Sequence, residues 1–195
     1  SVDNRLGASG LLKWISEQRN NDSGSLEEHQ LRLESDENAV KIVTIHKSKG
    51  LEFPIVFCPF SWNGSRIKDK GHPVMFHDET NDMALTLDLG SQYRKTHREC
   101  EEKEQLAENL RLLYVALTRA QHRCYLVWGR INNADTSAVA YLFHGDPTYD
   151  GDKGIVAALS DEFKGLTDDQ MMADLRDVQG KSDGAIHLCS LPERE

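Results

Sequence analysis

The sequence has no long apolar run and few cysteines, and both absences limit what the protein can be. None of its apolar runs reaches the length of a membrane-spanning helix, and no segment has the pattern of a secretory signal. The four cysteines lie far apart and form no C-x-x-C pair, which argues against a disulfide framework or a zinc site. Cys58 and Cys124 fall inside apolar runs, so we expect buried, reduced thiols in a cytoplasmic protein.

The chain also lacks the excess of positive charge that nucleic-acid-binding modules usually carry. Its formal net charge is −9, although hydrophobic and charged contents of 38% and 28% are those of a globular protein. Residues 41–70 are an exception, with six basic side chains against two acidic ones. This locally positive stretch is compatible with a phosphate-binding surface in an otherwise acidic chain.

No phosphate loop of the form G-x-x-x-x-G-K-[ST] occurs in the sequence. Asp78 and Glu79 follow an apolar run, as the metal-binding acid pair of an NTPase does, but without that loop we expect an ordinary turn. His72 and His77 are five residues apart with no third ligand nearby, so we expect no metal site there. We expect Trp62 at the edge of the core rather than stacked on a base.

The most informative stretch that is present covers residues 41–53. Alternating β-branched residues at 41–45 predict a buried or half-buried strand, which a polar turn at 46–50 and a second strand at 55–58 follow. Gly50 can adopt a positive φ or let a phosphate approach the backbone closely. A basic loop at the carboxyl end of a strand suits phosphate and lies where open α/β sheets bind their ligands.

The rest of the chain alternates strand and helix patterns, which indicates the α/β class. Leucines recur on one helical stripe at 106, 110, 113 and 117, and they predict a helix within residues 91–120 whose charged segment at 98–104 faces solvent. The other expected elements are a hairpin of strands 74–77 and 83–87, strands 124–128 and 186–189, a helix at 137–143, acidic surface helices at 154–163 and 168–178, and helical turns near 11–15 and 27–33.

Arg119 ends the predicted helix at a point where both helix faces are apolar. A guanidinium in such a place needs an anionic partner. Glu108 lies on the same side of the helix and could form a structural salt bridge with it, but a bound phosphate would serve equally well. The residues alone leave these two alternatives open.

Two stretches resemble conserved motifs of superfamily 1 DNA helicases of the UvrD/RecB group. Residues 44–53 (TIHKSKGLEF) are similar to motif V of that group, and residues 108–120 (ENLRLLYVALTRA) are similar to motif VI. The two occur in the family's order, and the surrounding sequence, roughly residues 31–143, resembles the RecB branch.

The resemblance implies an α/β fold that is part of a RecA-like (P-loop NTPase-type) second motor domain, with a mostly parallel sheet, a β-hairpin and flanking helices. Residues 1–38 would be the exit of an inserted helical domain, and residues 39–145 would belong to the second RecA-like domain. Residues 146–195 would be an acidic linker or C-terminal extension that precedes a nuclease domain in the parent protein.

The resemblance also assigns a nucleotide site. Arg119 matches the family's arginine finger, the catalytic residue that stabilises charge on the transferred phosphoryl group. Glu52 matches the acid that holds the ribose, and Gly50 lets this loop approach the nucleotide. ATP and Mg²⁺ would bind the full-length parent, and the fragment alone would hold neither tightly.

At the other end of motif V, the resemblance implies contacts with DNA. Thr44 and His46 match positions that touch the backbone of a single strand, where hydroxyl and imidazole groups position DNA without reading its sequence. Lys47 would join them as a DNA-binding residue. For both Lys47 and Lys49 the alternative is a solvated surface lysine.

The function implied is that of a fragment of an ATP-dependent DNA helicase/exonuclease that works in double-strand break repair and recombination. Its partners would be single-stranded and duplex DNA ends, the first RecA-like domain of the same parent chain, and RecC- and RecD-like subunits. The alternative is a stand-alone regulatory or DNA- and partner-binding module without motor activity. A nuclease is a third class, but the sequence shows no cluster of acids and lysine after a strand that would mark its active site.

Overall fold

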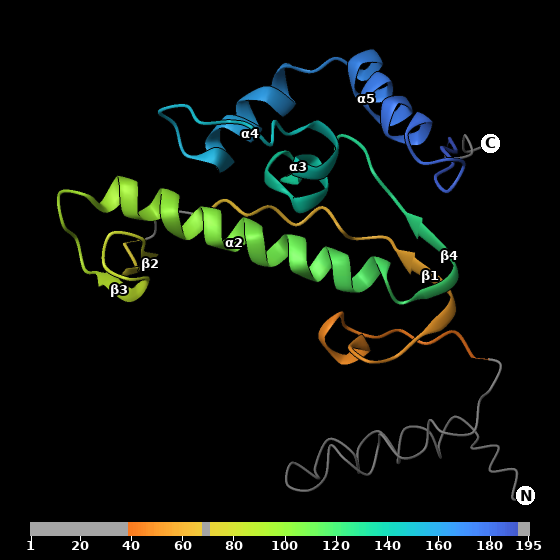
Figure 1. The fold of residues 1–195 in the computed structure, drawn as a ribbon, viewed down its shortest axis with the longest axis horizontal. Helices are drawn as coiled ribbons and strands as arrows, with labels where there is room; N and C mark the ends of the chain where they lie inside the picture. Colours follow the sequence, from red (N-terminus) through yellow and green to blue (C-terminus); the bar gives the residue numbers. More distant parts are fainter. Residues whose placement is uncertain (1–38, 68–70, 191–195) are drawn as a thin grey trace, which may run out of the picture. The chain divides into compact units, whose positions relative to one another are not determined.

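A computed structural model describes residues 39–67 and 71–190 of the chain. The chain divides into two compact units between Ile42 and Val43, and every element named below belongs to the unit that begins at Val43 (Figure 1). The helical turns predicted near residues 11–15 and 27–33 lie outside the described residues. In chain order the elements are η2 (His46–Ser48), β1 (Phe53–Cys58), β2 (Val74–Asp78), β3 (Ala84–Asp88), α2 (Arg94–Leu117), β4 (Ala120–Leu126), η3 (Ala134–Thr136), α3 (Ala138–His144), α4 (Ile155–Gly165) and α5 (Asp168–Gly180).

β1 and β4 form a small parallel sheet, so the fold is mixed α/β as predicted. Phe53 pairs with Ala120 and Cys58 with Leu126, and the register has one irregularity between Phe53 and Ile55. Pro54 occupies that irregularity, because it has no N–H to donate to a ladder. The strand predicted at 55–58 is confirmed and begins two residues earlier.

β4 begins four residues before the predicted strand at 124–128. Residues 121–123 are polar and exposed, and of these Arg123 pairs with Ile55 of β1. Phe57 and Tyr125 are 68% and 44% exposed and stack on each other with ring centroids 4.8 Å apart. Of the two thiols expected in the core, Cys58 is buried and Cys124 is exposed.

The predicted strand at 41–45 is not formed. Residues 41–44 have no regular secondary structure, and the chain turns into η2 at Ile45. No strand among the described residues pairs with this segment, so its backbone would gain no ladder of hydrogen bonds. The Ser48 N–H instead donates to the carbonyl of Thr44 at 3.1 Å.

The predicted hairpin is confirmed as the antiparallel pair β2–β3, with Val74 opposite Asp88 and Asp78 opposite Ala84. Figure 1 shows α2 running from this hairpin toward the β1–β4 pair. The charged segment at 98–104 was predicted to face solvent, but part of it is buried. Glu102 is 8% exposed and accepts the Ile67 N–H at 2.9 Å.

Two more glutamates of α2 accept backbone N–H groups from β2. Glu104 accepts from His77 at 2.7 Å, and Glu101 accepts from Met75 at 3.4 Å. The carboxylates therefore satisfy donors on an edge strand that would otherwise be open to another strand.

The leucine stripe of α2 is confirmed as its buried face. Leu106 and Leu113 are 3% and 6% exposed, and Leu113 packs with Ala138 and Val139 of α3. Leu126, near the end of β4, packs against the same cluster. This core joins the long helix, the parallel strands and α3.

α4 and α5 form close to their predicted bounds, but α4 is not a surface helix. Its Leu159 and Phe163 share a core with Ala134, Ala140 and Met171, the last on α5, and Trp62 packs at the edge of this core as expected. The strand predicted at 186–189 is absent, because no described strand lies beside it to accept its hydrogen bonds. None of the helices described here is apolar and long enough to cross a membrane.

His144 ties α5 to this core. Its side chain is fully buried; Nδ1–H donates to Asp174 Oδ2 at 2.7 Å, and Nε2 accepts from the indole of Trp128 at 3.1 Å. The two bonds fix the tautomer of the imidazole, because only Nδ1 can carry the proton.

Asp88 closes the hairpin onto α2. Its buried carboxylate accepts the backbone N–H groups of Ser91 and Gly90, the Ser91 hydroxyl and the His97 ring. The bond from the Ser91 backbone and then that from Gly90 hold the pKa of Asp88 well below its usual range.

We therefore predict that Asp88→Asn lowers stability in a pH-dependent way. A depressed folded-state pKa stabilises the protein above the unfolded pKa of about 4, and this contribution is lost as the pH falls further. Urea midpoints should show a deficit for Asp88→Asn near about pH 7 that shrinks by about pH 3. Asp150→Asn, an exposed control, should show no such deficit. A deficit of equal size at both pH values would contradict the prediction.

Candidate functional site

The two motif segments meet at the amino ends of β1 and β4. The Phe53 N–H donates to the Arg119 carbonyl at 2.9 Å, which joins the loop before β1 to the turn before β4. Figure 1 shows this loop, in orange, beside the turn that follows α2. The sequence predicted this loop at the carboxyl end of a sheet, and that prediction is wrong. Because the strand predicted at 41–45 is not formed, the loop lies at the amino ends of the described strands.

Arg119 is half-buried, and its guanidinium contacts only neutral acceptors. Nε donates to the Val115 carbonyl, Nη1 to the Leu51 carbonyl and Nη2 to the Thr118 hydroxyl, each at 3.0 Å. These bonds position the side chain between the end of α2 and the loop before β1. They leave its positive charge without a carboxylate partner among the described residues.

The structural salt bridge with Glu108 is not formed. The Glu108 carboxylate instead binds Arg111 at 2.7 Å on the exposed surface of α2. This finding rules out the structural salt bridge between Glu108 and Arg119 that the sequence left open.

Gly50 and Glu52 flank the residue whose carbonyl holds Arg119. Gly50 has a φ of +83°, and apart from its two chain neighbours no atom of the described residues lies within 4 Å of the position that a Cβ would occupy. Glu52 is exposed, and its Oε2 accepts from the Gln121 amide at 3.2 Å. The structure therefore brings Gly50, Glu52 and Arg119 to one end of the β1–β4 pair.

Thr44, His46 and Lys47 lie on the adjacent turn and are all exposed. The Thr44 hydroxyl accepts the Lys47 N–H at 3.3 Å, and its own proton remains free to be donated. The side chains of His46 and Lys47 form no hydrogen bond or ion pair with described residues. Ser48 is buried and donates to the Ile45 carbonyl at 2.7 Å, which fixes the turn.

A cleft that the sequence did not reveal lies beyond the carboxyl ends of β1 and β4. It encloses about 620 Å³ between residues 62–66, residues 132–136 and Lys164. Trp62 supplies an aromatic wall, and Arg66 and Lys164 supply positive charge. Its two walls are loops that are about 70 residues apart in the sequence, and neither contains a recognisable motif. The cleft could therefore be found only from the fold. The one hint in the sequence was the basic character of residues 41–70.

The positive charge of the cleft is partly neutralised. Lys164 Nζ lies 3.1 Å from Asp135 Oδ2 and also donates to the Ser160 hydroxyl. Burial raises the pKa of Asp135, but hydrogen bonds from Ser160 and Lys164 outweigh it and leave that pKa below its usual value. Arg66 is exposed and forms no hydrogen bond or ion pair with the described residues, although its charge helps to lower the pKa values of Asp135 and Asp161.

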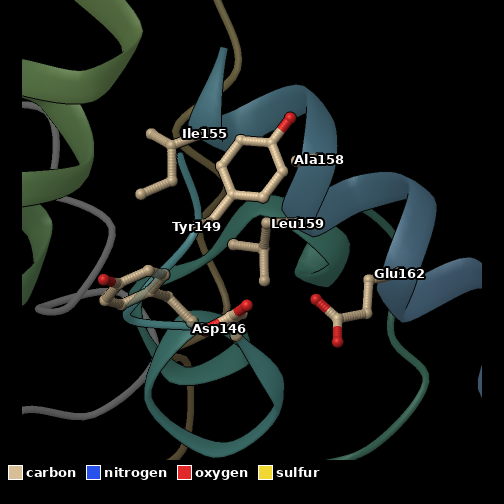
Figure 2. A pocket seen from close by; sticks show the side chains of 8 residues that line it. Asp146, Tyr149, Ile155, Ala158, Leu159 and Glu162 are labelled. Atoms are coloured by element: carbon tan, nitrogen blue, oxygen red, sulfur yellow. The ribbon is translucent and has the colours of Figure 1, made fainter. Parts of the chain in front are cut away.

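A second hollow, between α4 and residues 141–149, is too small for a substrate. Figure 2 shows Tyr149, Ile155 and Leu159 around it, with Asp146 and Glu162 at its rim. Its volume of about 10 Å³ is that of roughly one water molecule.

The sequence features that resembled metal sites have other partners. Asp78 accepts from the hydroxyl and N–H of Thr80, which lower its pKa, and Glu79 pairs with Lys103 at 2.9 Å. His77 pairs with Glu104. Within residues 39–67 and 71–190, no three His, Cys, Asp or Glu side chains are grouped so that they could hold a metal ion.

Comparisons with known proteins agree with the two motif segments. A family model described as the UvrD-like helicase C-terminal domain matches residues 11–130. The RecBCD enzyme subunit RecB of Escherichia coli (strain K12) is 41% identical over 116 residues, 60% of this chain and 9% of that protein. The RecB subunit of Mycobacterium tuberculosis (strain H37Rv) is 36% identical over 142 residues, 72% of this chain and 13% of that protein.

A relative from Clostridium beijerinckii has a different name and is described as an ATP-dependent helicase/nuclease subunit. It is 33% identical over 116 residues, which are 56% of this chain and 9% of that protein. The matched region is therefore roughly a tenth of the length of these relatives.

Alanine at two glycines should distinguish backbone strain from steric overlap. Gly50→Ala should cost about 1 kcal/mol of unfolding free energy, because only the left-handed backbone is strained. Gly64→Ala should cost more, because its Cβ would meet the Asn133 carbonyl oxygen at 2.7 Å, at the wall of the cleft. Gly180→Ala, at the end of α5 in open space, should cost nothing. Urea denaturation checks this order, and equal losses at Gly50 and Gly64 would contradict it.

Proposed function

The chain belongs to the family of UvrD-like helicase C-terminal domains, and from this premise we propose that it is a motor segment of a RecB-like, ATP-dependent DNA helicase/nuclease subunit. Its relatives are named as such enzymes. In the full-length parent this segment supplies an arginine finger and contacts to single-stranded DNA. The phosphate loop and the Mg²⁺-binding acids, which this sequence does not contain, come from the first RecA-like domain of the parent.

The single observation that carries this proposal is the uncompensated charge of Arg119. A guanidinium has five N–H donors, and the three bonds to neutral acceptors occupy one on each nitrogen. One N–H on Nη1 and one on Nη2 remain to donate to phosphate oxygens. A γ-phosphate is the anion that completes this site in the parent.

Glu52 and Gly50 are proposed to complete the nucleotide wall. Glu52 is exposed two residues from Gly50, and its carboxylate is held only by an amide, so a ribose hydroxyl can replace or join that contact. The bare backbone at Gly50 leaves space beside the loop. Arg119 bonds the carbonyl of Leu51 between them, so a shift in the loop on nucleotide binding also moves the arginine.

Thr44, His46 and Lys47 are proposed to contact the DNA backbone. Their exposed donors lie within six residues of Gly50, on the turn that leads into the nucleotide loop. Nucleotide binding can therefore alter the grip on DNA through one short segment, as a shift between two states with different contacts.

The proposed architecture is the later part of a second RecA-like motor domain. The parallel β1–β4 pair and the packing of α2 against it support this assignment for residues 39–145. Residues 146–195 follow as an extension, which in the parent leads toward a nuclease domain. Because Leu159, Phe163 and Met171 share a core with Ala134 and Ala140, we propose that this extension is docked on the motor domain.

The parent would act on DNA ends in double-strand break repair and recombination, together with RecC- and RecD-like subunits. The printed names of the relatives, which refer to the RecBCD enzyme and to a helicase/nuclease, support this proposal. Residues 1–38, as the exit of an inserted helical domain, remain a proposal from resemblance.

In the full-length parent, Arg119→Lys should lower the turnover of ATP by on the order of a hundredfold or more, with little change in ATP affinity. Lysine cannot reproduce the two-pronged contact, which strengthens as charge shifts in the transition state. Glu52→Gln should mainly weaken ATP binding, because a ribose contact is equally strong before and during the reaction. Steady-state kinetics and nucleotide titrations separate the two effects.

Arg111→Lys is the matched control, because Arg111 is exposed and, among the described residues, its one ion-pair partner is Glu108. It should leave both parameters unchanged. If Arg119→Lys and Glu52→Gln gave the same kinetic phenotype, or if Arg119→Lys simply unfolded the protein, the assigned roles would fail.

The isolated 195-residue chain should hydrolyse no ATP and bind single-stranded DNA only weakly. The proposed DNA surface has few cations and the net charge of the chain is −9. The affinity for single-stranded DNA should therefore fall steeply with salt through counterion release. Lys47→Ala should reduce the salt dependence, whereas Lys95→Ala, an exposed lysine on α2, should not. Fluorescence anisotropy of a labelled oligonucleotide measures this. Tight binding that persists at high salt would contradict the proposed DNA surface.

A further inference from the structure

Cys58 of β1 and Cys124 of β4 project from the same face of the parallel pair. The register places Val56 opposite Cys124 and Cys58 opposite Leu126, so the two cysteines are offset by two residues, which preserves the face. Their sulfur atoms lie 3.9 Å apart and are not bonded covalently. The nucleotide and DNA contacts proposed above use neither thiol.

The two thiols are chemically unequal. A hydrogen bond from Cys124 lowers the pKa of Cys58 to about 7, while the same interaction raises the pKa of Cys124. The thiolate is the reactive form of cysteine, so these opposite shifts favour Cys58 over Cys124 as the attacking sulfur. Cys124 is exposed and gives small molecules access to the pair.

We propose that Cys58 and Cys124 form an oxidisable dithiol site, which reacts with a peroxide to give a disulfide between β1 and β4. A disulfide bond is about 2 Å long, so the two sulfur atoms have to come closer by about 2 Å. Residues offset by two positions on neighbouring strands lie roughly 7–8 Å apart, which exceeds the usual Cα separation across a disulfide, so the backbone of β1 or β4 has to shift together with the side-chain rotation. The bond would tie β1 to β4 near the end opposite the Phe53–Arg119 hydrogen bond. It would thereby fix both ends of the sheet that carries the two motif segments.

The reaction proceeds in two displacements. The Cys58 sulfur attacks one oxygen of hydrogen peroxide, the O–O bond breaks, and the hydroxide released takes up the proton lost by that thiol to form water. The Cys124 sulfur then attacks the sulfenic sulfur of Cys58, the S–O bond breaks, and the departing hydroxide takes up the Cys124 proton. In sum, two thiols and one peroxide give one disulfide and two water molecules.

The other two cysteines provide internal controls. Cys100 is half-buried on α2, where burial raises its pKa and disfavours the reactive thiolate. Cys189 is exposed in the irregular segment after α5, and within the described part of the chain no hydrogen bond links either residue to another cysteine.

The test is mild hydrogen peroxide treatment of the 195-residue chain, followed by alkylation, tryptic digestion and mass spectrometry. The expected product has lost two hydrogen atoms, links the peptides that contain Cys58 and Cys124, and returns to two alkylated thiols after reduction with a dithiol. The proposal is overturned if both thiols remain fully alkylatable while Cys189 is oxidised, or if the disulfide joins either of them to Cys100 or Cys189.

Substitutions at the two exposed cysteines test which sulfur attacks the peroxide first, and they leave the buried Cys58 in place. In Cys124→Ser, whose site is exposed, the sulfenic acid on Cys58 should persist and be captured by dimedone, whereas the wild-type chain should give little adduct. Cys189→Ser should form the disulfide as the wild type does. An unmodified Cys58 in Cys124→Ser would overturn the role of Cys58 as the attacking sulfur.

Discussion

The pairing of β1 with β4 is the constraint on which the proposed site depends. The hydrogen bond from the Phe53 N–H to the Arg119 carbonyl opens this ladder and sets the loop before β1 against the turn after α2. A register slip of one residue would reverse the faces of a strand and would move the loop away from the guanidinium. The site is therefore a consequence of backbone pairing, and its side chains are held mainly by carbonyl groups.

The long helix α2 gives the same sheet its support while it anchors the hairpin through its charges. One face carries the leucines that pack on α3 and β4, and the start of the helix carries carboxylates that accept backbone N–H groups from the segments around β2. Glu102 shows why a charge-rich stretch need not be a solvated face. A buried carboxylate with a backbone donor at 2.9 Å is satisfied, and the sequence does not indicate which acid will meet such a donor.

Local patterns predicted the elements whose stability is local or whose partner is near in sequence. The hairpin needed only a turn and two alternating runs, and α2 needed only its leucine stripe. The failures share a cause, because residues 41–45 and 186–189 have strand propensity without a described partner strand, whereas residues 120–123 have little propensity but pair with β1. Strand formation depends on a neighbour, and one sequence does not state which neighbour is present.

The sequence supplied a proposal for the residues of the site but not their geometry. Motif resemblance named Gly50, Glu52 and Arg119, whereas the fold shows that Arg119 bonds Leu51 and that Glu108 turns to Arg111. An arginine that keeps its charge unpaired beside an open loop costs stability unless a ligand supplies the anion. The cost is small for Arg119 because its side chain is only half-buried, so water can solvate the N–H groups that form no bond with the described residues. The same partial exposure that makes the fold tolerate Arg119 also leaves the guanidinium accessible to the nucleotide proposed above.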